Sequence, residues 1–302
     1  MMRIWPLLSL LSGCSIVLVD EPCDTAVSGL EETGTEPELL FLAAGTGATH
    51  TCGILDDASL YCWGLGDEGQ LDAPDGRFDS LSVGHAHACA IDEAGLVQCW
   101  GRNDADQASL SGSFEAVSAG GEHTCGLDAD GGVQCVGRND QGQTDVPEYS
   151  FLSISAGATH TCGIVRLEDE ATGSVCWGEL KKAVSSDEAH LSIISGSGWA
   201  CAESSVSVSC YGDDGEGQHS VTDSLRSGTL VAGSRHGCGL NRDGLIRCWG
   251  GNDASQLDAP AGSYSALFSG PTSLHTCALG ADGVGAAPLT CWGLDAENQL
   301  TP

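Results

Sequence analysis

Residues 114–143 read FEAVSAGGEHTCGLDADGGVQCVGRNDQGQ, and this stretch decides the fold because variants of it recur along the chain. Self-similarity at a fixed period indicates a repeat architecture. The first cysteines of successive copies are 37, 36, 37, 39, 37 and 39 residues apart. Seven copies therefore run from about residue 39 to the C-terminus, with paired cysteines at 52/62, 89/99, 125/135, 162/176, 201/210, 238/248 and 277/291.

Each copy predicts short antiparallel strands. One strand precedes a Gly-x-x-His turn, a second carries His-x-Cys-x-Leu, and a third follows an Asp/Gly turn and carries Val-x-Cys. The connection 143–147 should return across the blade as an irregular fourth pass. Sheets of ~40 residues repeated radially match a propeller. A β-solenoid is the alternative, but it needs shorter rungs and no hairpin. We predict an all-β, seven-bladed β-propeller with three to four short strands per blade.

The cysteine spacing predicts one disulfide within each blade. In a hairpin centred on Asp130, Cys125 faces Cys135. Directly opposed residues have Cα atoms ~4.5–5.5 Å apart, and a disulfide accepts ~4.4–6.8 Å. Metal sites would need a second pair of ligands, so neither a metal nor a cofactor is predicted. The predicted bridges join Cys52 to Cys62, Cys89 to Cys99, Cys125 to Cys135, Cys162 to Cys176, Cys201 to Cys210, Cys238 to Cys248 and Cys277 to Cys291.

The motif Gly-x-x-His-Thr-Cys-x-Leu, followed by Asp-Gly-x-Val-x-Cys-Trp-Gly-x-Asn-x-x-Gly-Gln-Leu, resembles the regulator-of-chromosome-condensation repeat. The resemblance covers about 260 residues and implies a seven-bladed propeller. The short repeats are similar to bacterial members, which include a secreted β-lactamase-inhibitor propeller. The eukaryotic namesake exchanges nucleotide on a nuclear GTPase, but this chain has no basic tail for chromatin. A shared fold does not carry function over.

The N-terminal residues predict export. A short apolar run ends in Leu11-Ser12-Gly13-Cys14, which resembles a lipobox with Cys14 as the lipidated residue. Cys14 could otherwise pair with Cys23. We predict a signal peptide at 1–13, an acidic flexible tether at 14–38 and the propeller at 39–302. The predicted repeats are 39–77, 78–113, 114–148, 149–190, 191–222, 223–263 and 264–302.

Composition limits the classes of partner. The formal charge is 11 − 42 = −31, which repels phosphate backbones and makes nucleic acid an improbable partner. Sixteen cysteines without zinc-type spacing indicate an oxidising compartment. No run approaches ~20 apolar residues, so the membrane is expected only through a lipid anchor. We expect a monomer in the bacterial cell envelope, lipid-anchored, or secreted.

Histidines and tryptophans recur at fixed places and are interpreted as structural. Six histidines stand two residues before the first cysteine, on the disulfide face, where a hydrogen bond to a local carbonyl is expected. Most third strands place Trp after the second cysteine, to pack on the neighbouring blade. Acidic turns such as 128–131 lack the twelve-residue loop that an EF-hand needs. The G-x-G-x-x-G match at 64–69 opens no helix.

The sequence favours a non-catalytic scaffold that binds a protein or surface macromolecule through loops on one face. An enzyme acting on polysaccharide, with carboxylates at the channel mouth, is the alternative, and an inhibitor of a secreted enzyme is a third. The fourth copy departs most from the repeat at Glu179–His190. Lys181 and Lys182 there are the only lysines. With Trp199, they are the candidate partner-binding residues, against the alternative of a decayed blade with a solvated loop.

Overall fold

The computed structural model describes residues 39–167, 171–185, 189–221, 225–281 and 285–302. Residues 182–185 are described by their backbone. The predicted signal peptide, Cys14, Cys23 and the tether lie outside the described residues and remain predictions. The described chain consists of strands and turns, and none of it forms a helix long and apolar enough to cross a membrane.

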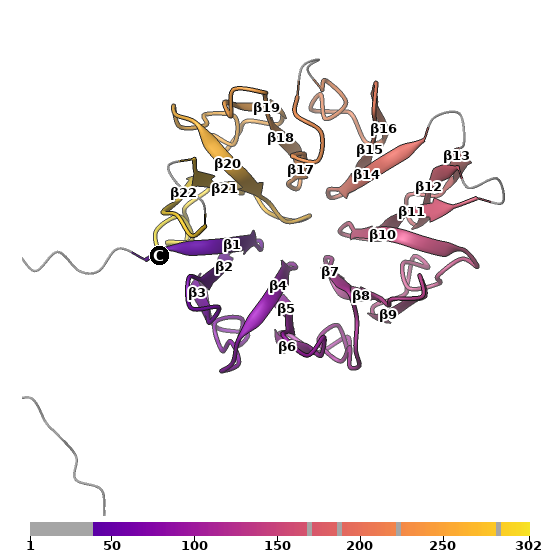
Figure 1. Cartoon of the computed structure of the whole chain (residues 1–302), viewed down its shortest axis with the longest axis horizontal. Helices are drawn as coiled ribbons and strands as arrows, with labels where there is room; N and C mark the ends of the chain where they lie inside the picture. Colours follow the sequence, from indigo (N-terminus) through magenta and orange to yellow (C-terminus); the bar gives the residue numbers. More distant parts are fainter. Residues whose placement is uncertain (1–38, 168–170, 186–188, 222–224, 282–284) are drawn as a thin grey trace, which may run out of the picture. The chain divides into compact units, whose positions relative to one another are not determined.

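Seven antiparallel sheets form a ring, and each contains strands consecutive in the chain (Figure 1). The first strand of each sheet is the innermost. Blades 1 to 3 are β1 (Phe41–Thr46), β2 (His50–Leu55), β3 (Leu60–Gly64); β4 (Phe78–Val83), β5 (His87–Asp92), β6 (Val97–Gly101); and β7 (Ala116–Ala119), β8 (His123–Leu127), β9 (Val133–Gly137). Blade 4 is β10 (Ser150–Ala156), β11 (His160–Arg166), β12 (Thr172–Gly178) and β13 (Lys182–Ser185). Blades 5 to 7 are β14 (His190–Ser195), β15 (Trp199–Ser204), β16 (Val208–Gly212); β17 (Val231–Ala232), β18 (His236–Leu240), β19 (Ile246–Gly250); and β20 (Tyr264–Phe268), β21 (His275–Gly280), β22 (Leu289–Gly293).

The predicted pairing of the cysteines is confirmed. In every blade the register of the second and third strands sets the two cysteines opposite each other, as in Cys125↔Cys135. All seven bridges lie within blades, with Cα atoms 4.0–4.1 Å apart. Blades 4 and 7 close longer hairpins, with cysteines 14 residues apart, and blade 5 closes the shortest, with 9.

The connection between blades is a loop in the described chain, except after blade 4. There the chain turns back and pairs as β13 with β12, matching Ser185 to Ser174 and Lys182 to Cys176. Blade 4 is the one sheet with four strands. The segment predicted to depart from the repeat therefore adds an outer strand, and residues 182–185 are not a solvated loop.

The hydrophobic core is divided among the seams between blades. Each seam buries one blade's disulfide face against the next blade's first strand and, in most blades, against its third-strand tryptophan. Between blades 1 and 2, for example, Cys52 packs with Phe78, Ala90 and Trp100. Because sheets bury both faces, no single large core is needed, and small residues and disulfides supply much of the packing.

Candidate binding surface

The innermost strands line a central channel that carries no charge. A cavity of about 210 Å³ lies between the ends of the seven first strands. Serine hydroxyls there accept hydrogen bonds from backbone N–H groups of the next blade, as Ser82 does from Ala119 and Ser118 from Ala156, both at 2.9 Å. None of the described lining residues is acidic. The carboxylates of the polysaccharide-hydrolysis alternative are not among these lining residues.

The recurring histidines link neighbouring blades. The Nε2 atom of His87 lies 2.8 Å from the hydroxyl of Thr124 in the next blade, and that hydroxyl donates to the carbonyl of Gln107 at 2.7 Å. His123 repeats this arrangement with Thr161 and Gln143. The expected bond to a local carbonyl is wrong, because the threonine in the middle of the next blade's triplet places its hydroxyl beside the histidine ring.

One residue per blade decides whether this bond forms. Where the triplet of the next blade has threonine as its middle residue, the histidine bonds to that threonine, as His236 does to Thr276 at 2.7 Å. Where the next triplet has Ala88 or Ala200, both ring nitrogens of His50 and His160 are buried without a partner. The threonine is thus the determinant, and the sequence shows it directly.

Burial keeps the ring histidines neutral. Desolvation lowers the pKa of His87, His123 and His275 to about 3. It lowers the pKa of His50, His160 and His236 to about 4. Among the described residues, no cluster of three His, Cys, Asp or Glu could hold a metal ion. The histidines form a set of hydrogen bonds between blades.

The connection glutamine completes each regular seam. Its side-chain Oε1 accepts a backbone N–H two residues earlier, as Gln70 does from Glu68 at 2.7 Å. Its backbone carbonyl accepts the next blade's tryptophan, as in Trp100 Nε1 to Gln70 O at 3.0 Å. The prediction that these tryptophans pack on a neighbouring blade is confirmed.

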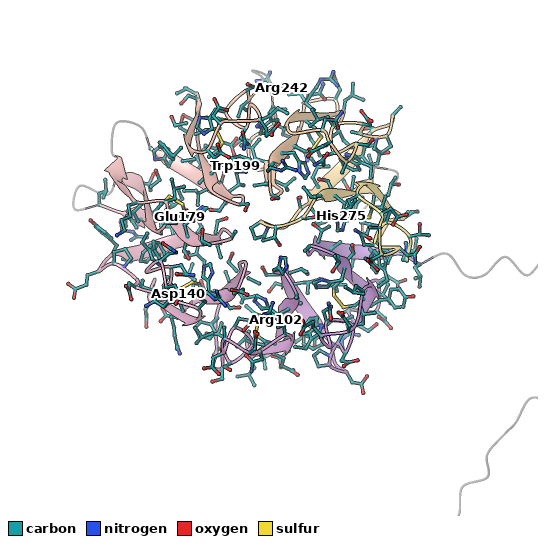
Figure 2. The ribbon with its side chains drawn as sticks, turned by 180° about the vertical axis from the view of Figure 1, so that it is seen from behind. Arg102, Asp140, Glu179, Trp199, Arg242 and His275 are labelled. Carbon is teal, nitrogen blue, oxygen red and sulfur yellow. A yellow bond between two sulfur atoms is a disulfide. The ribbon has the colours of Figure 1, made fainter. Side chains whose placement is uncertain are left out.

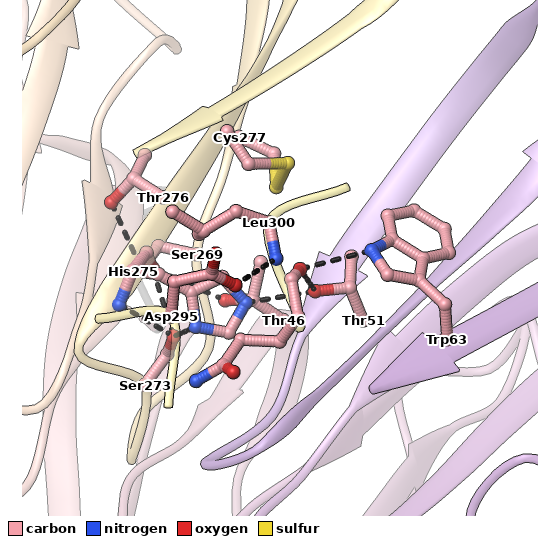
Figure 3. Close-up of a disulfide and its surroundings, with 12 residues drawn as sticks. Thr46, Thr51, Trp63, Ser269, Ser273, His275, Thr276, Cys277, Asp295 and Leu300 are labelled. Carbon is pink, nitrogen blue, oxygen red and sulfur yellow. Dashed lines mark hydrogen bonds between the residues drawn. A yellow bond between two sulfur atoms is a disulfide. The ribbon is translucent and has the colours of Figure 1, made fainter. Parts of the chain in front are cut away.

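The seam between blades 7 and 1 closes the ring with the same parts (Figure 3). Thr51 contacts His275 Nε2 and donates to the carbonyl of Gln299, both at 2.8 Å. Trp63 donates to the same carbonyl at 2.9 Å. A backbone bridge from Phe41 to Ala287 adds two more bonds. The C-terminal turn thus holds the first blade without exchanging a strand.

Trp199 occupies the histidine position of blade 5 and is only 1% exposed (Figure 2). Its indole donates to the carbonyl of Ser234 in blade 6 at 2.9 Å, and its ring lies over Gly237. The indole ring, larger than an imidazole, fills the space that Gly237 leaves because it has no side chain. The prediction that Trp199 contacts a partner does not fit this burial, and we assign it to the core.

The seam between blades 4 and 5 lacks most of these parts. His160 is unpartnered, Ala200 replaces threonine, and the connection glutamine is missing. Leu180 packs in its place against the cluster that contains Ala200 and Tyr211. A cavity of about 270 Å³ lies above it, lined by Glu179 and Asp213 among others. The seam is therefore apolar at its base and acidic at its mouth.

The two lysines lie beside this seam. Lys181 is exposed and forms no ion pair within the described part of the chain. Lys182 begins β13. By contrast, Arg102, Arg138 and Arg235 are each paired with two carboxylates. The structure brings the lysines to the edge of blade 4 and leaves the Lys181 side chain facing solvent.

Sequence reasoning missed a second departure, in blade 5. Glu203 stands where the other blades have a buried Ile or Leu, and its side chain is itself buried. It lines a cavity of about 380 Å³ together with Val206 and His219. Alignment of the six His-x-Cys triplets with the Trp199 triplet of blade 5 would have found it, because Glu is the one polar residue four positions after the triplet's first residue.

The repeat model for Regulator of chromosome condensation (RCC1) matches residues 43–70, 78–107, 114–143 and 229–256. Four of the seven blades thus match the RCC1 repeat. The four matched stretches lie in blades 1, 2, 3 and 6, all of which close their disulfides across ten residues. The RCC1 match leaves out blades 4, 5 and 7, and the structural departures lie in the first two of these.

Solved structures share the propeller fold. The ectodomain of the Physcomitrella patens receptor kinase CR4 is 24% identical, with a TM-score of 0.69 over 84% of this chain and 73% of that one. The CRINKLY WD40 ectodomain of the Arabidopsis thaliana receptor kinase ACR4 is 28% identical, with a TM-score of 0.57 over 70% and 80%. Human WBSCR16 is 16% identical, with a TM-score of 0.55 over 80% of each chain. Comparison with curated proteins finds no match.

Proposed function

We propose that this RCC1-repeat propeller is a non-catalytic scaffold of the cell envelope, or a secreted protein, that binds another protein through the loops of blades 4 and 5. The observation that carries the proposal is where the repeat breaks. Packing alone maintains a repeat, so departures from it are candidate functional sites. Here the missing connection glutamine, the added strand β13 and the buried Glu203 all fall in two adjacent blades.

The compartment follows from the disulfides. Seven bridges are typical of oxidising environments and rare in the cytosol. Lipid attachment at Cys14 would hold the propeller at a membrane surface on the 14–38 tether. Intact mass of the native protein tests this part, because a mature chain that begins elsewhere without acyl groups contradicts it.

The uncharged lining of the channel supports binding over hydrolysis. A glycosidase needs two carboxylates flanking the scissile bond, and the channel lining has none. The ectodomain neighbours are themselves parts of receptor kinases. A rigid scaffold with variable loops is suited to recognition.

Affinity capture from the native envelope tests the proposal. The wild-type protein should retain one partner reproducibly, and charge reversal of both lysines should reduce the amount retained. Reversal of Arg242 and Arg247 on blade 6, both exposed, gives a control with the same change in charge (Figure 2 labels Arg242). Retention that is equal in all three proteins would contradict the placement on blades 4 and 5.

A further inference from the structure

The carboxylate of Glu203 occupies a position that the repeat reserves for a hydrocarbon. The equivalent residues of the other six blades are all buried Ile or Leu: Ile54, Ile91, Leu127, Ile164, Leu240 and Leu279. Glu203 is only 6% exposed. Burying a carboxylate is costly unless it is paired and hydrogen-bonded. An apolar residue would pack there at no such cost, as six sister blades demonstrate.

Only one of the two carboxylate oxygens of Glu203 accepts hydrogen bonds from the described residues. Oε2 accepts the hydroxyl of Ser192 at 2.8 Å and the backbone N–H of Gly228 at 3.0 Å. No described residue donates to Oε1, and no described Lys, Arg or His lies within 4.0 Å of the carboxylate. Arg226, two residues before Gly228, turns away and donates to the carbonyl of Ser265 at 2.8 Å. The described residues thus fix one oxygen of the carboxylate and place no cationic side chain beside it.

A cavity of about 380 Å³ leads to this carboxylate. Its walls include the aliphatic side chains of Val206, Val208, Val221 and Leu225. Val206 is 82% exposed, at a hairpin tip where blades 1, 2, 3 and 6 carry charged residues. His219 also lines the cavity, and its Nε2 atom is buried without a partner. The site therefore has apolar walls, a fixed carboxylate and a second unused polar atom.

We propose that this cavity is a specificity pocket for an arginine side chain of the partner protein. The aliphatic stem of arginine packs on the valines and Leu225, and its guanidinium reaches Glu203. A guanidinium offers five donors in a fixed planar fork, whereas an ammonium is a compact point charge. Two polar atoms on residues that line the cavity, Glu203 Oε1 and His219 Nε2, have no hydrogen-bond partner among the described residues. That arrangement matches arginine better than lysine.

Charge supports a basic partner segment as well. The formal charge of −31 attracts cations over long range and steers their approach. His219, which lines the same cavity, lies beside a further carboxylate, with Nδ1 3.8 Å from Asp214. The inference rests on the proposed protein-binding function but makes no use of the lysines.

Peptide titration tests the pocket without knowledge of the partner. The probes are the capped peptides Ac-Gly-Arg-Gly-NH2, its lysine analogue and its citrulline analogue, which keeps the shape of arginine without the charge. NMR titration should show the arginine peptide binding at least tenfold more tightly than the other two, with shifts in the Val206 and Val208 methyl signals. Equal binding of arginine and citrulline, tighter binding of lysine, or tighter binding of free arginine than of the capped peptide would overturn the assignment.

Variants separate recognition from folding. Glu203→Gln should weaken the arginine peptide at least tenfold. Glu203→Leu, which restores the residue type of the other blades, should abolish binding while raising the midpoint of thermal unfolding. Glu115→Gln removes the same charge from an exposed site on blade 3 and should bind like the wild type. A Glu203→Leu protein that binds like the wild type would contradict the pocket.

The two proposals can fail separately. If the wild type captures a partner and Glu203→Gln captures it equally well, the arginine pocket is wrong and the scaffold function stands. If the arginine peptide binds in a Glu203-dependent way but no protein partner is captured, the pocket stands and the scaffold function is wrong.

Discussion

His275 Nε2 and the Thr51 hydroxyl lie 2.8 Å apart, and this contact joins the last blade to the first across 224 residues of sequence. The same hydroxyl donates to the carbonyl of Gln299. One threonine therefore contacts both the strand that carries His275 and the C-terminal turn. Both partners are buried. Blades 7 and 1 do not share a strand, so side-chain hydrogen bonds contribute to closing the ring.

Removal of this hydroxyl should weaken the closed ring. Thr51→Ala leaves His275 Nε2 buried without a partner, which typically costs ~1–3 kcal/mol. Urea denaturation followed by tryptophan fluorescence measures the change, and Thr49→Ala, next to it but outside the seam, is the control. The complementary Ala88→Thr gives buried His50 a partner and should stabilise by ~0.5–1.5 kcal/mol. A more stable Thr51→Ala protein together with a less stable Ala88→Thr protein would refute this account of the seams.

Acid should destabilise the propeller through the ring histidines. Burial holds the pKa of all six at about 3 or 4 in the folded protein, against about 6.5 when unfolded. The stabilisation is complete above pH 6.5 and is lost as the pH falls toward 4. Each histidine then contributes a loss of roughly 1 to 2 kcal/mol per pH unit.

Proton uptake on unfolding at pH 5 measures this effect. The wild type should take up about one proton per ring histidine, and His123→Gln should take up about one fewer. Comparison of the two cancels the contribution of the acidic surface. Equal uptake would mean that His123 is already protonated in the folded state.

The blade disulfides should each stabilise the fold. Replacement of Cys125 and Cys135 by alanine opens an 11-residue loop, with an expected loss of ~2–3 kcal/mol in the chain-entropy model. Non-reducing peptide mapping of the wild type should recover Cys125 joined only to Cys135. Any bridge between blades would contradict the pairing.

The strand order, the register and the disulfides could be predicted from the sequence because the repeat states them seven times. The partner of each histidine could not, because the bond crosses to a blade about 37 residues away and depends on the neighbouring triplet rather than on the local strand. Trp199 was expected to mark a binding site because it breaks the pattern. The large Trp199 ring instead fills the space beside Gly237 across the seam. Only the packing in the folded protein distinguishes a binding residue from a core residue at this position.

The lysines at the edge of blade 4 should contribute to partner binding. Lys181→Glu with Lys182→Glu should weaken binding of the captured partner by ~1 kcal/mol or more, because rim charges act through complementarity with the partner. Thermal stability should stay within ~0.5 kcal/mol, as is usual for surface changes. Unchanged affinity would return this segment to a purely structural role.

Amine-specific cross-linking of the protein to its captured partner tests the central claim most directly. Lys181 and Lys182 are the only lysines in the chain, so apart from the N-terminal amine they are the only amines a cross-linker can reach. A partner seated on blades 4 and 5 should be cross-linked through these two residues with a short-armed reagent, and mass spectrometry should map the joined peptides to them. A stably captured partner that never cross-links through either lysine would contradict binding at this surface.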